Sequence, residues 1–194
     1  MKNIALAVIL FIFCISCQNS VADAVKDVNP KSEQITNEPN DVTLSKAPDF
    51  SLPNINGQYK SLEDYTGQLI YMDIWATWCG PCLKQFPALK ALKEKYKNSG
   101  IVFLSISVDP DSKKSKWLKM VKEEKLKGEQ LFAGKQSGFG EAYRVEFIPR
   151  FLLISQNGEI LMDQAPLPMD HRTGGINPVL EDIFQIYIKT NQNN

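Results

Sequence analysis

Residues 71–87 read Y-M-D-I-W-A-T-W-C-G-P-C-L-K-Q-F-P, a stretch in which a strand pattern gives way to a helix pattern. An apolar run over residues 69–76, with Asp73 inside it, predicts a strand. Pro81 is compatible with a helix start because the first turn has no intrahelical partner for the N–H that proline lacks. Cys79 is therefore predicted to lie where the strand ends and the helix begins. Apolar residues then recur at helical spacing, namely Leu83, Phe86, Leu89, Leu92 and Tyr96.

The pair Cys79 and Cys82 has the spacing and the position of a redox-active dithiol. Free N–H groups and the dipole at a helix N-terminus favour a thiolate, which is the reactive form of cysteine. We expect Cys79 to be the exposed attacking thiol and Cys82 the more buried resolving thiol. Asp73 lies six residues before Cys79, where a buried carboxylate of raised pKa would exchange a proton with Cys82. The alternative is an acid at the strand edge that makes only a structural hydrogen bond.

The segment D-I-W-A-T-W-C-G-P-C, from Asp73 to Cys82 and followed by Pro87 in the helix, resembles the active-site segment of thioredoxin. The longer chain and its N-terminal leader resemble the extracytoplasmic TlpA/ResA branch of thiol-disulfide oxidoreductases. This resemblance implies an α/β, thioredoxin-like fold, with a central mixed sheet flanked by helices and an N-terminal hairpin extension. It also implies that the Cys79–Cys82 disulfide is the redox centre and that no further cofactor is needed.

A second site element is expected at Ile148-Pro149, which precedes a predicted strand and resembles the cis-proline loop of thioredoxin-like folds. Such a loop would leave the backbone of Ile148 free to pair with a substrate chain. The alternative is an ordinary trans proline at the start of an edge strand. Around the disulfide, we predict that substrate also contacts Gly80, Pro81 and Trp78, with plain packing as the alternative for Trp78.

The remaining elements are predicted from periodicity and turn signals. Asn56-Gly57 favours a hairpin between a strand at 47–52 and a return strand at 58–60. Asp109 to Ser112 is typical of a cap for a helix that runs through Leu126. The side chains of Trp117, Leu118 and Val121 are expected to face the protein interior. Seven lysines over 113–127 indicate a solvated helix face, with a basic patch as the alternative. Further strands are expected at 101–108, 129–133, directly after Pro149 through 154, and at 159–162, and further helices at 141–145 and 179–189.

The N-terminus has the pattern of an export signal. A basic start and an apolar core over residues 4–15 indicate a signal peptide, because this core is shorter than the roughly 20 residues of a membrane-spanning helix. Ile15-Ser16-Cys17 resembles a bacterial lipoprotein cleavage box with Cys17 as the lipidated residue, although Cys14 stands where leucine is usual. A cleaved soluble protein, an uncleaved anchor and a second redox pair of Cys14 with Cys17 are the alternatives. The expected organisation is a lipoprotein-type signal peptide (1–16), a flexible tether (17–46) and a thioredoxin-like domain (47–190).

Composition limits the classes of partner. The chain has 194 residues, 43% apolar residues and a formal net charge of zero, which favours one globular domain and gives no indication of nucleic-acid binding. His171 is the single histidine, and with the cysteine pair it allows a copper site as a minor alternative to no metal. Leu83 after Cys82 excludes covalent haem attachment at this motif. We expect a monomer in the periplasm or cell envelope.

The function predicted from this resemblance is reduction of protein disulfides, followed by re-reduction from a membrane electron donor. Gly80-Pro81 between the cysteines resembles the reducing thioredoxin type, near about −270 mV, rather than the oxidising DsbA type near about −120 mV. Cytochrome c maturation and general disulfide reduction are both compatible with the sequence. The alternatives are a thiol peroxidase of related fold and a non-catalytic module that docks partners through the Ile148 edge.

Overall fold

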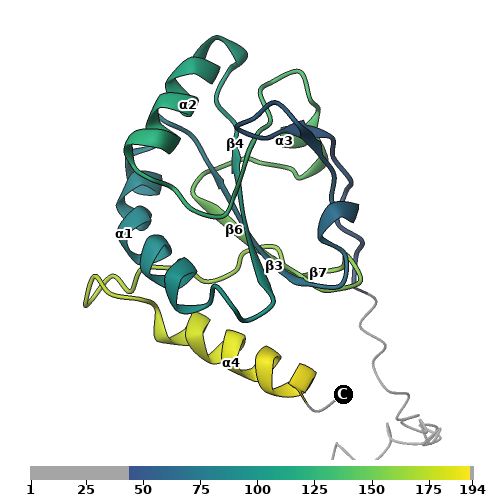
Figure 1. The fold of residues 1–194 in the computed structure, drawn as a ribbon, viewed down its shortest axis with the longest axis vertical. Coiled ribbons are helices and arrows are strands. Elements are labelled where there is room, and N and C mark those ends of the chain that lie inside the picture. The colour runs from purple at the N-terminus through teal and green to yellow at the C-terminus, as the bar shows by residue number, and fades with distance from the viewer. Residues whose placement is uncertain (1–43, 193–194) are drawn as a thin grey trace, which may run out of the picture. The chain divides into compact units, whose positions relative to one another are not determined.

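A computed structural model of the chain describes residues 44–192, and it has a central five-stranded mixed sheet (Figure 1). The strand order is β5-β4-β3-β6-β7, in which β3, β4 and β5 run parallel and β6 and β7 are antiparallel to their neighbours. The strands are β3 (Leu69–Trp75), β4 (Ile101–Ser107), β5 (Glu129–Phe132), β6 (Arg150–Ile154) and β7 (Ile160–Met162). The predicted fold class is confirmed. The predicted signal peptide, the lipidation site Cys17 and nearly all of the tether lie outside the described residues.

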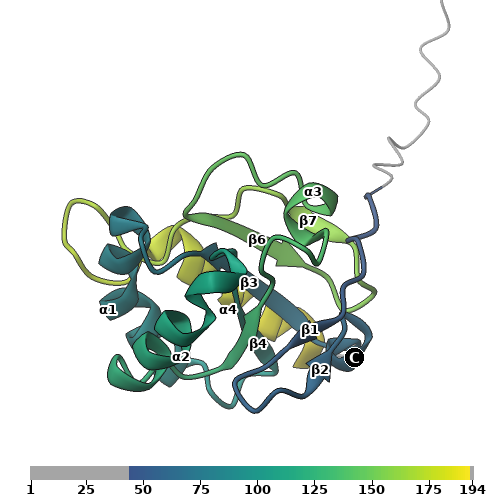
Figure 2. The same ribbon diagram turned by 90° about the horizontal axis from the view of Figure 1, so that it is seen from above.

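Helices cover one face of this sheet. They are α1 (Gly80–Lys95), α2 (Lys114–Glu123) and α4 (Pro178–Gln192), with α1 and α2 side by side in Figures 1 and 2. On this face Tyr71 of β3 stacks on Phe151 of β6 and meets Phe184 of α4 edge-on. Alternate residues of β3 point to opposite faces, so Tyr71, Asp73 and Trp75 all lie under the helices.

The opposite face is covered by the N-terminal segment and by α3 (Phe139–Ala142). Phe50, Phe139 and Tyr143 pack there against Ile70 and other alternate residues of the central strands. A separate hairpin of β1 (Leu52–Pro53) and β2 (Tyr59–Lys60) lies beside the sheet (Figure 2). It is followed by the turn η1 (Glu63–Tyr65). The N-terminal hairpin is thus confirmed, with both of its strands shorter than predicted.

Several boundaries differ from the sequence prediction. Residues 47–51 form no strand, because their backbone and side chains bond irregularly, with Ala47 N donating to Gly158 O and Asp49 accepting from Leu62 N. α3 begins at Phe139 rather than at 141, whereas β6 begins at Arg150, directly after the proline loop, as predicted.

The second helix also begins later than expected. A 3-10 turn, η2 (Asp111–Lys113), precedes α2, and no side chain caps either element. Leu118 is 38% exposed, so the prediction that it faces inward is wrong, whereas Trp117 and Val121 are buried. All seven lysines over 113–127 are exposed, as predicted for a solvated helix face, and acidic side chains lie among them, as in the pair Lys119–Glu123. Within residues 44–192 no helix has the length and apolar character needed to cross a membrane.

Candidate redox site

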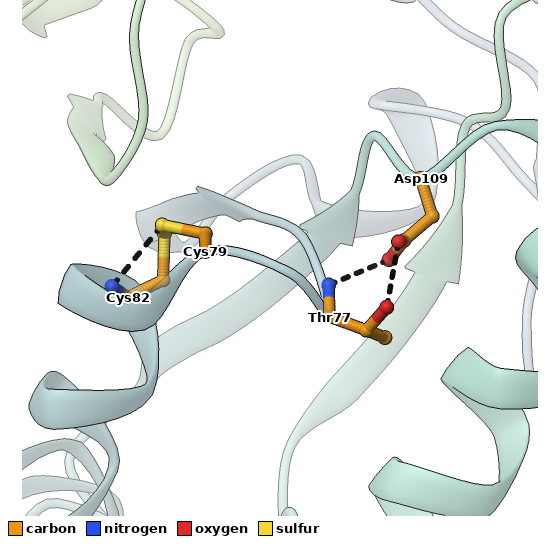
Figure 3. The surroundings of a disulfide bond; sticks show 4 residues. All are labelled: Thr77, Cys79, Cys82 and Asp109. Carbon is orange, nitrogen blue, oxygen red and sulfur yellow. Dashed lines mark hydrogen bonds between the residues drawn. A yellow bond between two sulfur atoms is a disulfide. The ribbon is translucent and has the colours of Figure 1, made fainter.

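Cys79 and Cys82 form a disulfide at the start of α1, with Cα atoms 5.3 Å apart. Cys79 is the N-cap residue, in an extended conformation, and its Sγ accepts a hydrogen bond of 3.1 Å from the backbone N–H of Cys82 (Figure 3). Pro81 occupies the first turn, where its missing N–H costs nothing. The predicted strand–turn–helix junction is therefore confirmed. An N–H aimed at the sulfur of Cys79, at a helix N-terminus, stabilises negative charge on that sulfur.

Both sulfur-bearing residues are buried in the oxidised protein. Cys79 is 4% exposed and Cys82 is 2% exposed, so the predicted contrast between an exposed and a buried thiol is wrong for this state. The reason is the packing of Trp75, Phe86 and Trp117 around the pair in a single apolar cluster. Exposure near the disulfide is instead concentrated in Gly80, Pro81 and Trp78, whose side chain is 63% exposed.

Asp73 is buried under the helices, two residues before Trp75 on the same face of β3. Its Oδ1 accepts a hydrogen bond of 2.5 Å from Ser105 Oγ on β4. Burial raises the pKa of Asp73, and the nearby Lys93 ammonium offsets only part of that rise. A buried acid of raised pKa on the face that carries the disulfide fits the predicted role as proton acceptor for Cys82, which remains a prediction.

The bond between Ile148 and Pro149 is cis, so the predicted cis-proline loop is confirmed and the trans alternative is wrong. Ile148 packs against the cluster that contains both cysteines, which places this loop beside the disulfide. A pocket of about 530 Å³ opens between this loop and Trp78, and it is bordered by Phe147, which is 52% exposed. Of the residues predicted to contact substrate, Trp78 and Ile148 border this pocket, and Gly80, Pro81 and Pro149 do not line it. Phe147 also lines it, although no sequence pattern marked that residue.

A buried carboxylate holds the turn that leads to Cys79. Asp109 has no exposed surface, and it accepts hydrogen bonds from Thr77 N (2.8 Å) and Thr77 Oγ1 (2.7 Å), as Figure 3 shows. A third hydrogen bond of 2.8 Å comes from Ser107 Oγ. The prediction that Asp109 caps a helix is wrong. The carboxylate instead joins the end of β4 to the residue two positions before Cys79.

Comparison with known proteins agrees with this geometry. The Redoxin family profile matches residues 43–169. The chain belongs to the Redoxin family. It is a TlpA/ResA-like member of the thioredoxin superfamily, as predicted.

The Redoxin relatives include the thiol-disulfide oxidoreductase ResA of Geobacillus kaustophilus, which is 32% identical over 126 residues, covering 60% of this chain and 65% of that protein. This chain thus spans slightly less than two thirds of the curated relatives it matches. A solved thiol-disulfide oxidoreductase from Bacteroides fragilis is 31% identical with a TM-score of 0.56, over 63% of this chain and 91% of that one. A Bacteroides vulgatus protein assigned to the same class is 41% identical with a TM-score of 0.61, over 73% and 90% of the two chains.

The single histidine of this Redoxin protein takes no part in the redox site that the structure describes. His171 is exposed in the loop between β7 and α4. Across residues 44–192 no three side chains of His, Cys, Asp or Glu gather as metal ligands. The expectation of a cysteine pair that works without a metal or another cofactor stays a prediction.

Proposed function

We propose that this protein is an extracytoplasmic thiol-disulfide oxidoreductase that reduces protein disulfides through Cys79 and Cys82. The observation that carries the proposal is the disulfide at the N-terminus of α1, beside the cis-proline loop and the pocket under Trp78. Helix N-termini lower the pKa of cysteine thiols, and a short C-x-x-C ring gives the mixed disulfide an internal nucleophile. The names of the ResA relative and of the Bacteroides fragilis protein support the same reaction class.

The reaction has two exchange steps. The thiolate of reduced Cys79 attacks a substrate disulfide, whose S–S bond breaks and leaves a mixed disulfide with one substrate thiolate released. Cys82 then gives its proton to Asp73, and its thiolate attacks the Sγ of Cys79, so that the second substrate thiolate leaves and the enzyme disulfide forms. A membrane electron donor returns two electrons, and with two protons from solvent the S–S bond is broken and the dithiol is restored.

Substrate binding is assigned to the concave surface beside the disulfide. An extended substrate chain would pair with the backbone of Ile148 next to Pro149, as in strand addition. Gly80 and Pro81 are exposed next to the cysteines, and Trp78 borders the pocket. The pocket is lined by the apolar side chains of Val108, Val145 and Phe147. They favour a substrate segment with an apolar side chain beside its disulfide.

The redox potential of the wild-type protein tests the direction of the reaction. We expect equilibration with dithiothreitol buffers to give a value near about −270 mV, and reduced protein to accelerate insulin disulfide reduction. A potential above about −150 mV would contradict the reductase assignment. Consumption of hydrogen peroxide without insulin reduction would instead identify a thiol peroxidase, and inactivity in both assays would identify a binding module.

We also propose that the protein is a monomer held at the membrane by a lipid on Cys17, since residues 1–17 have the pattern of a lipoprotein signal. The variant Cys17→Ser is expected to move the protein from the membrane fraction to the soluble fraction of cells and to lose labelling by a palmitate analogue. The matched variant Cys14→Ser should keep both properties, because Cys14 precedes the cleavage point. Membrane retention of Cys17→Ser would show that another feature anchors the chain.

A further inference from the structure

Lys93 of α1 is an unusual lysine, because it is only 6% exposed. Its Nζ donates to Ser105 Oγ at 3.0 Å and to the carbonyl oxygen of Lys127 at 2.9 Å. Ser105 Oγ in turn donates to Asp73 Oδ1. Lysines are rarely buried unless they are paired, and here the pairing takes the form of a hydrogen-bonded chain of three side chains. This chain runs from α1 through β4 to the acid on β3.

The outer end of this hydrogen-bonded series, Lys93, reaches a surface pocket far from the disulfide. Lys93 borders a pocket of about 340 Å³ that is also lined by Glu94, Lys97, Lys127 and Glu129. Along α1, Lys93 follows Cys82 by eleven residues, which corresponds to about 16 Å at the rise of an α-helix. Asp73 is therefore linked to a part of the surface that a substrate docked at Trp78 would leave uncovered.

We propose that Ser105 and Lys93 carry protons between Asp73 and this second pocket, so that Asp73 exchanges protons with water while substrate covers the disulfide. The inference rests on the proposed function, in which Asp73 takes a proton from Cys82. It assigns Lys93 and Ser105 as positioning residues, since neither touches the reacting sulfur atoms.

The proton balance of this route is simple. The Cys82 S–H bond breaks and an O–H bond forms on Asp73. The Lys93 ammonium releases a proton to water in the pocket, and its neutral amine then takes the Ser105 hydroxyl proton while the Asp73 proton passes to Ser105 Oγ, which leaves Lys93 as an ammonium again. Burial lowers the pKa of Lys93, which makes the neutral amine accessible. Reduction of the disulfide returns the proton along the same path.

The surroundings of Asp73 contain few other groups that compete for this proton. Tyr71 on the same strand has a pKa raised far above its ordinary value by burial, so its hydroxyl stays protonated. β6 presents Phe151 at the paired position, and the disulfide lies over the same face from α1. The carbonyl of Lys127 that holds Lys93 also accepts a hydrogen bond of 3.0 Å from Gln130 Nε2, which fixes that end of the chain.

The test measures the single-turnover oxidation of the reduced full-length protein by insulin, followed by tryptophan fluorescence across about pH 5–9. Lys93→Arg keeps a positive charge but cannot release a proton. We therefore expect its maximal rate to fall about tenfold while the acidic limb of the pH profile stays in place. Lys93→Met removes the charge that lowers the pKa of Asp73, so the limb should also move to higher pH. Ser105→Ala, a small change that interrupts the chain, should lose about tenfold in maximal rate.

Lys90→Met is the matched control, because Lys90 lies on the same helix and pairs with Glu124 at the surface. It should react at the wild-type rate at every pH. If Lys93→Arg and Ser105→Ala both match wild type across the pH range, protons leave Asp73 by another path and the proposal is wrong. Thermal melting identifies any variant that fails to fold, and Ser105→Ala then decides the outcome. Failure of the wild-type protein to react with insulin would overturn the proposed function instead.

Discussion

Replacement of Cys79 by alanine is expected to abolish insulin reduction, with a loss of about a thousandfold or more, because Cys79 is the proposed attacking thiol. Cys82→Ser should behave differently. Its Cys79 still attacks a substrate disulfide, but the mixed disulfide has no internal thiol to resolve it. We therefore expect Cys82→Ser to accumulate covalent adducts through Cys79, visible by non-reducing electrophoresis and lost on reduction.

The adducts of Cys82→Ser also identify the natural substrate. Mass spectrometry of the proteins attached to Cys79 would show whether the client is an apocytochrome c or a wider set of disulfide proteins. The double variant Cys79→Ala, Cys82→Ser is the matched control and should trap nothing. Residual turnover of Cys79→Ala above the level of this double variant would mean that Cys82 is itself the attacking thiol, and the proposed order of the two cysteines would be wrong.

Local signals made the redox segment predictable from the sequence. The strand, the turn, the helix start and the two cysteines are contiguous, and each depends on neighbours only a few residues away. The cis bond before Pro149 was inferred from resemblance and not from the loop itself. Element order then followed from periodicity, so the mixed sheet was predicted before its strand order was known.

Contacts across the sheet could not be predicted in the same way. Asp73 and Ser105 meet because the parallel register of β3 and β4 pairs them directly, and no local pattern specifies that register. No local pattern marks Lys93 as different from the other lysines of α1, and only the packing shows that it is buried. Asp109 before a proline is typical of a turn or a helix start, yet tertiary contacts with Thr77 took precedence over that local preference.

Burial of the cysteines was also beyond the reach of the sequence. The exposure of Cys79 was inferred from its chemistry, since an attacking thiol needs access to substrate. In the oxidised protein the cysteines share an apolar cluster with Trp75 and Phe86. Trp75 belongs to the strand before the turn and Phe86 to the helix after it. Trp78, which is 63% exposed, and Ile148, which packs against this cluster, both border the large pocket beside it.

The largest effect on stability is expected at Asp109, which no local pattern marked as part of the site. Asp109→Ala would leave the N–H and hydroxyl of Thr77 and the hydroxyl of Ser107 buried without their acceptor. Each unsatisfied buried group costs about 1–3 kcal/mol, with partial relief from relaxation. We expect the free energy of unfolding in urea to fall by about 3–5 kcal/mol in total. Thr77→Val, which removes only one donor, should lose about 1 kcal/mol.

The same carboxylate is expected to affect the rate of disulfide exchange. Thr77 is two residues before Cys79, so a loosened turn would misplace the sulfur of Cys79. Asp109→Asn keeps the shape but replaces one acceptor oxygen by a donor, so it should retain more stability than Asp109→Ala while its insulin reduction rate falls. Asp182→Ala, a change at an exposed position on α4, is the matched control and should alter stability by less than about 0.5 kcal/mol. If Asp109→Ala unfolds at the same urea concentration as this control, the carboxylate does not hold the turn, and the position of Cys79 depends on the packing of Trp75 and Phe86 alone.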